Sequence, residues 1–471
     1  MSKISEIFAE ICQNNTRKTA FYSYEDGAML RRNYYELARD VNSCISYLYE
    51  NGITAGSKIF VFTPASYQLT VFMIAAFQLG VQVMFIDIHA RQETFRKLFD
   101  KFAPDYVLVS NKTRALKPFF RGVHKIRRTI NVDQIPEREP RLKLPQISDD
   151  TPALLTTTTG STGMPKIVVR THRDLYNQLS LIQRNLPKSG APVIMSTSYI
   201  YIFAVLASGL TAVLPGVGLG KPAKAINAQL MHYKKVPITT IFTSPAFGLK
   251  AENYFPKLQQ MYIGGASISL TEAMTIADKF PKSQNYIVYG ATECNIITRC
   301  GLKSYIRELA THSRSTLGKP FKGVSLKIDE NDNILVSCTA LIKGFINDER
   351  KYDRRKESWY NTNDKGYIED GMLYYRGKYN YYVSHKGKKY YSHEIEQYIT
   401  VNCPTVHKCA VAQKRGKIVL FLTERGADEF EISEKLAKKY GFAVKYKYIA
   451  QLPHDARHHT KTDYKQLLKL I

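Results

Sequence analysis

The chain has 471 residues, enough for roughly two to four domains that each bury a core of their own. Hydrophobic residues make up 44% and charged residues 23%, which is typical of a folded globular protein and excludes a disordered chain or a collagen-like repeat. The net charge of +26 predicts a surface that attracts anions: phosphates, acidic proteins, nucleic acids or anionic lipids.

The cysteines and the amino-terminal residues indicate the cellular compartment. The seven cysteines are scattered and form no CxxC pair, so neither a zinc site nor a disulfide framework is expected. No apolar stretch follows a basic one at the amino terminus, which argues against a secretory signal peptide. We expect a cytoplasmic protein, with peripheral membrane association as the alternative that its positive charge leaves open.

The first part of the chain alternates between strand-like and helix-like segments. Residues 58–62, 82–86 and 106–109 are short apolar runs typical of strands. Residues 68–79 and 92–102 have the length and apolar spacing of helices. This alternation predicts a parallel α/β sheet.

A basic stretch follows these elements. Between Lys112 and Arg128 the chain has seven basic residues and no acidic one, with Phe119 and Phe120 among them. A contact with a membrane or a nucleic acid is one reading, but no recognised nucleic-acid motif accompanies the stretch. We therefore favour a solvated loop and helix face, and we do not expect nucleic acid as a partner.

The segment between Lys188 and Lys221 contains no charged residue and is long enough to span a membrane. Serines and threonines lower its hydropathy, and Pro192 and Pro215 interrupt it near its ends. A buried helix with its loops, forming part of a core or the wall of an apolar pocket, is favoured over a transmembrane helix.

The pattern changes towards the carboxyl terminus. Residues 324–328 and 334–336 alternate like short strands around a turn-rich segment, which predicts a β-rich subdomain. After Gly377 we expect a final block of strand, helix, strand and helix, so a domain boundary is placed there, giving domains 1–376 and 377–471. The second domain has 18 basic and 9 acidic residues, so its net positive charge per residue is about twice that of the first domain.

Residues 154–166, LLTTTTGSTGMPK, carry the strongest local signal, because an apolar strand leads into threonines, glycines and Lys166. Glycines let backbone amides approach an anion, hydroxyls donate to phosphate oxygens, and a lysine adds positive charge. The segment predicts a phosphate-binding loop, although it lacks the GxxxxGK[ST] pattern of the P-loop. Taken alone, it would also fit an ordinary threonine-rich loop.

More motifs follow in a fixed order. They are Gly264-Gly265-Ala266 after an apolar strand, Tyr289-Gly290-Ala291-Thr292-Glu293, Leu317-Gly318-Lys319-Pro320, Trp359 with Thr362-Asn363-Asp364, Gly377-Lys378-Tyr379-Asn380, Gly387 with Glu394-Ile395-Glu396, and Lys461 after Leu452-Pro453. With the loop at 158–166, this set resembles the AMP-forming adenylating enzymes: acyl-CoA synthetases, peptide-synthetase adenylation domains and luciferases. The resemblance spans nearly the whole chain.

The resemblance implies a fold and a reaction. The expected fold is a large N-terminal domain of α/β subdomains with a small β-barrel, followed by a small, mobile α+β C-terminal domain hinged near Asn380. In the implied reaction a carboxylate attacks the α-phosphate of ATP and expels pyrophosphate. The acyl-adenylate then passes its acyl group to CoA or to the phosphopantetheine of a carrier protein.

The resemblance also assigns roles to residues on the nucleotide side. The β- and γ-phosphates would be held by Thr159, Gly160, Ser161, Thr162, Gly163 and Lys166. Glu293 would bind Mg²⁺ through its carboxylate, and Thr292 would donate to the α-phosphate. Tyr289, followed by Gly290, would stack on adenine.

The remaining roles concern the ribose, the acyl group and the lysine. Asp364 would accept hydrogen bonds from both ribose hydroxyls, with Lys378 near them. Gly264, Gly265 and Ala266 would line the base and acyl pocket. Lys461, from the C-terminal domain, would neutralise charge on the attacking carboxylate and the α-phosphate.

This sequence departs from the usual motifs at several positions. Ile167 replaces a glycine, Lys378 an arginine and Asn380 the usual hinge aspartate, while Ser384 stands where many members have lysine. Lys378 keeps its charge without the planar fork of arginine. Asn363 replaces the glycine of TGD, a milder change because Asn tolerates left-handed backbone angles.

The side chains of Tyr199, Tyr201 and Phe203 suggest an apolar, aromatic wall for the acyl group. We therefore expect an apolar carboxylic acid, most readily a fatty acid, as substrate and CoA or an acidic acyl carrier protein as partner. The spacing of PHDARHHTK, residues 453–461, is similar to that in β-lactone synthetases, which act on 3-hydroxy acids, and His458 or His459 would then be a base. An inactive nucleotide- or acyl-binding protein, or a basic membrane-surface protein, is the third alternative.

Overall fold

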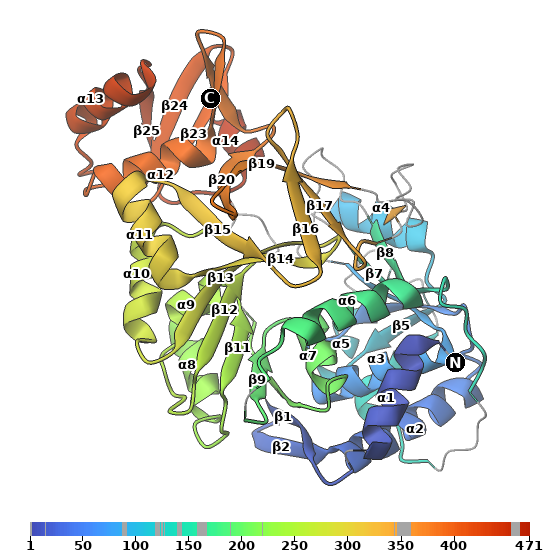
Figure 1. Cartoon of the computed structure of the whole chain (residues 1–471). Helices are drawn as coiled ribbons and strands as arrows, with labels where there is room; N and C mark the ends of the chain where they lie inside the picture. Colours follow the sequence, from blue (N-terminus) through green and yellow to red (C-terminus); the bar gives the residue numbers. More distant parts are fainter. Residues whose placement is uncertain are drawn as a thin grey trace.

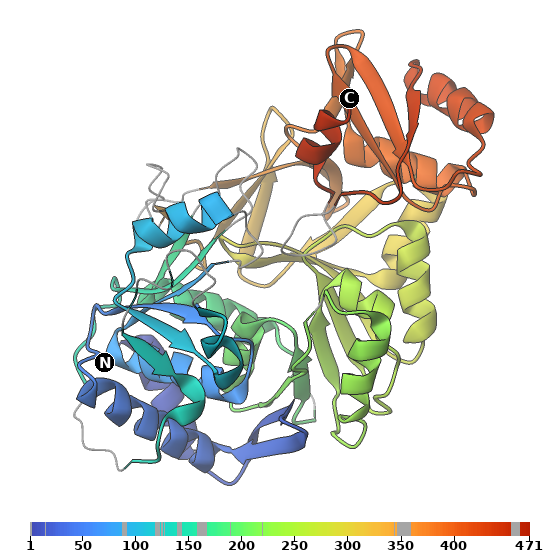
Figure 2. The same ribbon diagram turned by 180° about the vertical axis from the view of Figure 1, so that it is seen from behind.

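The computed structural model describes residues 2–14, 16–86, 92–117, 123, 126, 128–138, 144–157, 167–188, 190–218, 220–342, 344–345, 359–453 and 462–471. Figure 1 shows two sheets with helices around and between them, and the C-terminal residues in orange and red at one end. Seen from behind in Figure 2, the N-terminus lies at the opposite end from that C-terminal part.

The larger sheet joins strands from most of the chain. Among the described residues it has 13 strands in the order β16-β17-β19-β20-β15-β14-β13-β12-β11-β9-β10-β1-β2. Their bounds are β1 (Thr19–Glu25), β2 (Ala28–Asn33), β9 (Val193–Ser196), β10 (Thr211–Leu214), β11 (Thr240–Thr243), β12 (Gln260–Gly264), β13 (Gln284–Ala291), β14 (Asn295–Gly301), β15 (Ser315–Pro320), β16 (Val324–Ile328), β17 (Asn333–Cys338), β19 (Tyr360–Glu369) and β20 (Met372–Lys378). The β-rich part of the chain is expected to form a small barrel. Its strands, β15 to β17, β19 and β20, continue one end of this sheet, and the antiparallel pair β14–β15 makes the connection.

The smaller sheet contains the strands expected near the amino terminus. Its order is β18-β8-β7-β4-β3-β5-β6, and β3 to β7 run parallel. The bounds are β3 (Lys58–Phe62), β4 (Gln82–Phe85), β5 (Tyr106–Val109), β6 (Thr129–Asn131), β7 (Pro152–Thr157), β8 (Ile167–Thr171) and β18 (Gly344–Phe345). The predicted parallel α/β arrangement is confirmed.

The helices of this large part form layers on both faces of both sheets. They are α1 (Lys3–Asn14), α2 (Tyr34–Glu50), α3 (Tyr67–Leu79), α4 (Gln92–Phe102), α5 (Asn111–Arg114), η3 (Val132–Gln134), α6 (His172–Asn185), α7 (Tyr199–Leu206), α8 (Ala223–Met231), α9 (Pro245–Lys250), α10 (Leu270–Lys279) and α11 (Leu302–His312). Neighbouring strand residues face different cores, since Phe242 packs with α6 and α7 and Ile241 with α8 to α11. α3 lies between the sheets with nearly every residue buried, which explains why its sequence is apolar on all sides.

The uncharged segment after Lys188 forms buried elements of the large sheet and its central layer. β9, α7 and β10 follow one another there, and Ile202 to Leu206 of α7 are buried. In the described part of the chain no helix is long and apolar enough to cross a membrane. The core reading of this segment is the one that the structure supports.

The C-terminal residues contain more strands than expected. After β20 come β21 (Tyr382–His385), β22 (Lys388–Tyr391), α12 (Ser392–Asn402), β23 (Cys409–Lys414), β24 (Lys417–Leu422), α13 (Glu429–Tyr440), β25 (Lys445–Tyr448) and α14 (Tyr464–Lys469). The short strands form a hairpin, β21–β22, and a sheet of their own, β23–β24–β25. Residues 383–446 pack into a separate apolar core beneath α12 and α13.

Helix α12 connects this C-terminal part to the rest of the molecule, lying beside α10, α11 and β20 (Figure 1). Gln397 Nε2 donates to the carbonyl of Ile268 at 3.2 Å. An ion pair of 3.7 Å joins Lys408 to Glu272. Asn402 Nδ2 also donates to Ser313 Oγ at 3.0 Å, and His393 bonds to Ser315 Oγ at 2.8 Å, so polar contacts make up much of this junction.

The chain's single tryptophan lies just before the strand that carries Asp364. Trp359 directly precedes β19, and the Lys327 ammonium lies 4.4 Å from the centroid of its ring. That separation is within the range of a cation–π contact, which fixes the indole against β16.

Candidate functional site

The predicted nucleotide-binding residues meet where β12 and β13 end. Gly264 closes β12 and pairs with Val288 of β13, and Tyr289 and Gly290 follow. A Cβ atom on Gly264 would lie 2.8 Å from the Val288 carbonyl oxygen, and one on Gly290 would lie 1.9 Å from that of Asn295. Only glycine permits these close backbone approaches, so glycine has a structural reason at both positions.

Asp364, Tyr289 and Lys378 form a polar cluster across three strands. The Tyr289 hydroxyl donates to Asp364 Oδ2 at 2.7 Å. Asp364 pairs with Lys378 in the β19–β20 register, and the Lys378 ammonium forms an ion pair with Asp364 Oδ1. The Asp364 side chain is only 8% exposed, whereas that of Lys378 is 43% exposed. The structure thus brings together three residues that lie up to 89 positions apart in the sequence.

Electrostatics keep Tyr289 in its neutral form. Burial, and after it the negative charge of Asp364, raise the pKa of the Tyr289 phenol well above its ordinary value of 10. The phenol therefore retains its proton and remains a donor to the carboxylate. Its ring is held in place by this bond, beside the strand ends where we expect a base to stack.

The turn that carries Thr292 and Glu293 is held through its backbone by side chains that the sequence analysis did not single out. Arg170 on β8 is buried and donates to the Thr292 carbonyl at 2.8 Å, to Thr156 Oγ1 at 2.8 Å and to Gln178 Oε1 at 2.9 Å. The buried Gln178 on α6 donates in turn to the Glu293 carbonyl at 3.3 Å. Arg170 is a charged residue inside a mostly apolar strand, but nothing in the sequence indicates which carbonyls it reaches.

The Glu293 turn is fastened on its other side as well. The backbone N–H of Ile342 donates to the Glu293 carbonyl at 3.0 Å, and Gln178 also donates to Ala340 at 3.2 Å. These bonds leave the Glu293 carboxylate itself unengaged by the network. Within the described ranges, no group of three or more His, Cys, Asp or Glu residues could hold a metal ion. A cation at Glu293 would therefore need oxygen ligands from elsewhere, such as phosphates and water.

The predicted phosphate loop lies outside the described residues. That applies to Thr159, Gly160, Ser161, Thr162, Gly163 and Lys166. Its flanking strands, β7 and β8, pair antiparallel up to Thr157 and Ile167. Ile167, the departure from the usual glycine, is a fully buried strand residue.

The predicted catalytic lysine, Lys461, and the histidines His458 and His459 also lie outside the described residues. The described residues on the two sides of this segment are joined by a hydrogen bond of 2.8 Å from the Asp463 N–H to the Pro453 carbonyl. Tyr464, which begins α14, donates to Glu396 Oε1 at 2.6 Å and stacks on Tyr381 at 4.3 Å.

Glu396 belongs to the Glu394-Ile395-Glu396 motif on α12 and is an anchor for that segment. Besides Tyr464, the N–H of Val411 donates to Glu396 Oε1 at 2.8 Å. Burial raises the pKa of Glu396 from 4.5 to about 8, with the donors Tyr464 and Val411 opposing the rise. The motif therefore connects α12, β23 and the residue three positions after Lys461.

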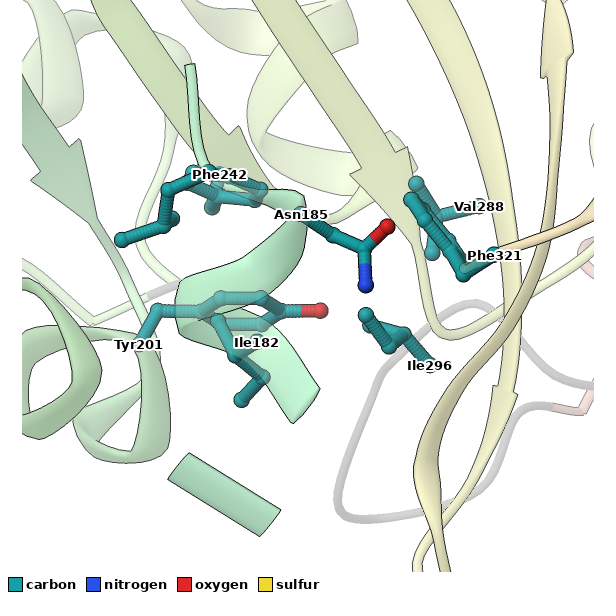
Figure 3. A pocket seen from close by; sticks show the side chains of 8 residues that line it. Ile182, Asn185, Tyr201, Phe242, Val288, Ile296 and Phe321 are labelled. Atoms are coloured by element: carbon teal, nitrogen blue, oxygen red, sulfur yellow. The ribbon is translucent and has the colours of Figure 1, made fainter. Parts of the chain in front are cut away.

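A small, mostly apolar cavity is lined in part by residues of β13 and β14 (Figure 3). It encloses about 220 Å³ of empty space, with the open space at its mouth included. The cavity borders the glycine-lined strand ends, because Val288 precedes Tyr289 and Ile296 pairs with Gly290. Its lining consists of Ile182, Asn185, Leu186, Tyr201, Phe242, Val288, Ile296 and Phe321.

Of the three aromatic residues expected in an acyl wall, only Tyr201 lines the cavity. Tyr199 is turned away, and its hydroxyl bonds to the backbone of Ser66. Phe203 is buried and packs edge-on against Phe77. Helical periodicity explains the difference, since residues two positions apart lie on different faces of a helix.

At Asn363 the substitution of the usual glycine is accommodated in the expected way. Its φ angle is 58°, in the left-handed region, and its N–H bonds to the Asn361 side chain at 2.8 Å. Asn is among the few non-glycine residues that adopt this conformation readily. Asp364 therefore keeps the backbone path that precedes it.

Comparisons with known proteins agree with this geometry. A D-alanine–D-alanyl carrier protein ligase of Streptococcus pyogenes is 21% identical over 400 residues, which cover 78% of this chain and 77% of that protein. The o-succinylbenzoate CoA synthetase of Bacillus subtilis, solved with its acyl-adenylate intermediate, has a TM-score of 0.80 at 18% identity over 98% of this chain and 97% of that chain. A fatty acyl CoA synthetase of Mycobacterium tuberculosis has a TM-score of 0.72 at 16% identity over 99% and 98% of the two chains.

The structural likenesses confirm the expected fold, a large α/β part followed by a smaller α+β part. The sequence profile of the AMP-binding enzymes matches residues 8–338, which is more than half of the chain. The chain therefore belongs to the AMP-binding enzyme family.

Proposed function

We propose that this enzyme activates an apolar carboxylic acid with ATP as an acyl-adenylate and passes the acyl group to the thiol of CoA or of a carrier-protein phosphopantetheine. The observation that carries the proposal is the buried Asp364 carboxylate, bonded to Tyr289 and Lys378, together with an apolar cavity lined by Val288, the residue before Tyr289. A polar anchor next to an apolar pocket suits a reaction between a nucleotide and an apolar acid.

The residues of the cluster fit a nucleotide. A carboxylate has about four lone-pair sites, and Tyr289 and Lys378 take two of those on Asp364, so that two remain for ribose hydroxyls. At Gly265 nothing lies within 4 Å of the position of a Cβ atom, which leaves room for a flat base next to Tyr289. We place Gly264, Gly265 and Ala266 along the base and the acyl group.

In the first half-reaction, a carboxylate oxygen of the acid forms a bond to the α-phosphorus, and the bond to the bridging oxygen breaks. Pyrophosphate leaves with that electron pair, while Thr292 donates to an α-phosphate oxygen and the 158–166 loop holds the outer phosphates. Mg²⁺, bound by Glu293 together with phosphate oxygens, would neutralise their charge. Lys461 would stabilise the charge on the acid and on the α-phosphate.

In the second half-reaction, a thiol gives its proton to water and its sulfur forms a bond to the acyl carbon, and AMP leaves with the electron pair of the anhydride bond. Both thiol acceptors have support: the relatives include a carrier protein ligase and CoA synthetases. The 18 basic and 9 acidic residues of segment 377–471 suit the phosphates of CoA or an acidic carrier protein.

The test follows pyrophosphate release with ATP, Mg²⁺ and a panel of fatty, 3-hydroxy and aromatic acids, with and without CoA. Lys461→Ala should lose acid-dependent release by a factor of about 100 or more, whereas Lys469→Ala, an exposed lysine on α14, should match the wild type. Products are identified by mass spectrometry.

An acyl-CoA or acyl-carrier product would support the proposal. A β-lactone made from a 3-hydroxy acid without CoA would overturn the thiol-acceptor half and favour the alternative drawn from residues 453–461. Absence of Lys461-dependent pyrophosphate from every acid would overturn the adenylation half.

A further inference from the structure

The lining of the cavity is mostly apolar. Phe242, Phe321, Val288 and Ile296 give it aromatic and aliphatic faces (Figure 3). Even with its mouth counted, its 220 Å³ is smaller than the roughly 300–1,000 Å³ of pockets that enclose drug-sized ligands. A long unbranched acyl chain would have to displace several buried side chains, which close packing makes costly.

Asn185 is polar, but the protein uses its hydrogen-bonding capacity. Its Nδ2 donates to the carbonyls of Leu181 at 2.8 Å and Lys322 at 3.2 Å, and its Oδ1 accepts from the Lys322 N–H at 3.2 Å. Asn185 therefore holds the turn after Phe321 in position. It has no donor left for a substrate.

Tyr201 provides the other polar atom of the lining. Its ring stacks on Phe242 at 4.5 Å with an interplanar angle of 14°, and its hydroxyl points into the space between Asn185 and Ile296 (Figure 3). Among the described residues the Tyr201 hydroxyl has no hydrogen-bond partner. Burial raises the pKa of this phenol above its ordinary value of 10, so it stays a neutral O–H donor.

The stack that holds Tyr201 is rigid. Phe242 stacks in turn on Tyr262 at 4.6 Å, and Tyr262 on Tyr286 at 5.0 Å, with interplanar angles of 12° and 17°. Such a row fixes the Tyr201 ring and therefore the direction of its hydroxyl. A donor that points into a cavity and bonds to no described residue is available to an acceptor atom of a ligand.

We propose that Tyr201 determines substrate specificity by donating to an oxygen on the acid, and that the substrate is a compact apolar acid bearing a hydroxyl or carbonyl oxygen remote from its carboxylate. The inference rests on the proposed adenylating function. It restricts the range of expected substrates to short, aromatic or branched acids. Long-chain fatty acids, which the sequence suggested, are then not expected as substrates.

The experiment measures acid-dependent ATP–pyrophosphate exchange with acids matched in size. The pairs are 4-hydroxybenzoate with 4-methylbenzoate, 3-hydroxybenzoate with 3-methylbenzoate, and 5-oxohexanoate with hexanoate, and palmitate is the long-chain comparison. Tyr201→Phe removes only the hydroxyl and keeps the ring in its stack. Tyr286→Phe removes a hydroxyl from the same stack outside the cavity, where it bonds to Gln284, and serves as the control.

The wild type should favour the oxygen-bearing acid of at least one pair by about two- to tenfold in kcat/KM, the value of one hydrogen bond. Tyr201→Phe should abolish that preference by lowering kcat/KM for the oxygen-bearing acid, and Tyr286→Phe should preserve it. A wild-type preference for palmitate, or an equal effect of Tyr201→Phe on both acids of every pair, would overturn the inference while leaving adenylation intact. If no acid supported exchange, the adenylating function would fail and the inference with it.

Discussion

On the strand side of the site, side chains and backbone are fixed by buried hydrogen bonds: Asp364 by Tyr289 and Lys378, and the Thr292–Glu293 turn by Arg170 and Gln178. On the C-terminal side, the described residues that flank Lys461 are held by the hydrogen bond from Asp463 to Pro453 and by that from Tyr464 to Glu396.

The difference has a physical consequence. Groups that bind a nucleotide gain from being positioned in advance, because no ordering entropy is then lost on binding. A group that acts in only part of a reaction cycle has to move, and Lys461 is predicted to be such a group. The following variants test whether the two sides differ in this way.

The largest effect is expected on the strand side, from Asp364→Asn. The amide keeps the size of the side chain but loses the charge that Lys378 and the ribose hydroxyls would meet, so kcat/KM for ATP should fall about 100-fold. Pyrophosphate exchange at varied ATP measures it. Asp370→Asn, in the exposed β19–β20 turn, should leave kcat/KM unchanged. A fall of less than threefold would remove Asp364 from the nucleotide site.

Arg170→Met tests the network behind the Glu293 turn. It leaves the Thr292 carbonyl, Thr156 and Gln178 without a buried donor, so the free energy of unfolding should fall by about 2–3 kcal/mol and kcat by about tenfold. Urea unfolding and exchange kinetics measure the two quantities.

The control for this variant is Arg173→Met, at the start of α6, where the side chain is 45% exposed and pairs with Asp149 and Asp150. Its unfolding free energy should change by about 0.5 kcal/mol or less. If Arg170→Met lost stability with kcat and KM for ATP both unchanged, Arg170 would be a structural residue without a positioning role.

The buried carboxyl of Glu396, in the C-terminal part, should make the stability of the protein depend on pH. The folded pKa of Glu396, about 8, lies above its unfolded value of 4.5, so the folded state binds the proton more tightly. The stability contributed by the protonated carboxyl is complete below pH 4.5 and is lost as the pH rises towards 8.

Glu396→Gln mimics the protonated form and keeps an acceptor for Tyr464 and Val411. Its melting temperature should match the wild type near pH 4.5 and exceed it by a few degrees at pH 8. Glu434→Gln, exposed on α13, should show no such divergence. Parallel curves for Glu396→Gln and the wild type would mean that the carboxylate is charged in the folded protein.

The smallest effect is expected at Asn363, next to the strand-side anchor. With φ at 58°, Asn363→Ala should lower the free energy of unfolding by about 1 kcal/mol, while Asn363→Gly should stay within about 0.5 kcal/mol of the wild type. Chemical unfolding resolves the two. Equal losses for both variants would assign the effect to the Asn363 side chain and not to its backbone angle.

The sequence predicted the elements whose signals are local. The strands at 58–62, 106–109 and 324–328 and the helix at 92–102 have the bounds that apolar spacing indicated. After Gly377 the sequence predicted one strand before each helix, whereas the structure has a hairpin at each place, β21–β22 and β23–β24. Fold class and family followed from the order of the motifs, which is information of a different kind from hydropathy.

The candidate site was only partly accessible from sequence. Motifs predicted Asp364, Tyr289 and Lys378 one at a time, but their mutual bonds depend on how β13, β19 and β20 are arranged. Arg170 and Gln178 act through backbone carbonyls of residues more than 100 positions away, and such partners have no signature in the chain. That Tyr201 and not Tyr199 reaches the cavity depends on the rotation of α7, which eight residues of nearly uniform hydrophobicity do not specify.

Trp359 has a practical consequence, because its position makes the protein its own fluorescent probe. It is the one indole in 471 residues, it lies five positions before Asp364, and it contacts the Lys327 ammonium, a group able to change its emission. Emission excited at the indole band therefore originates beside a single strand. A nucleotide that reorders this strand becomes visible without a dye, whereas events confined to residues 377–471 remain optically silent at that wavelength.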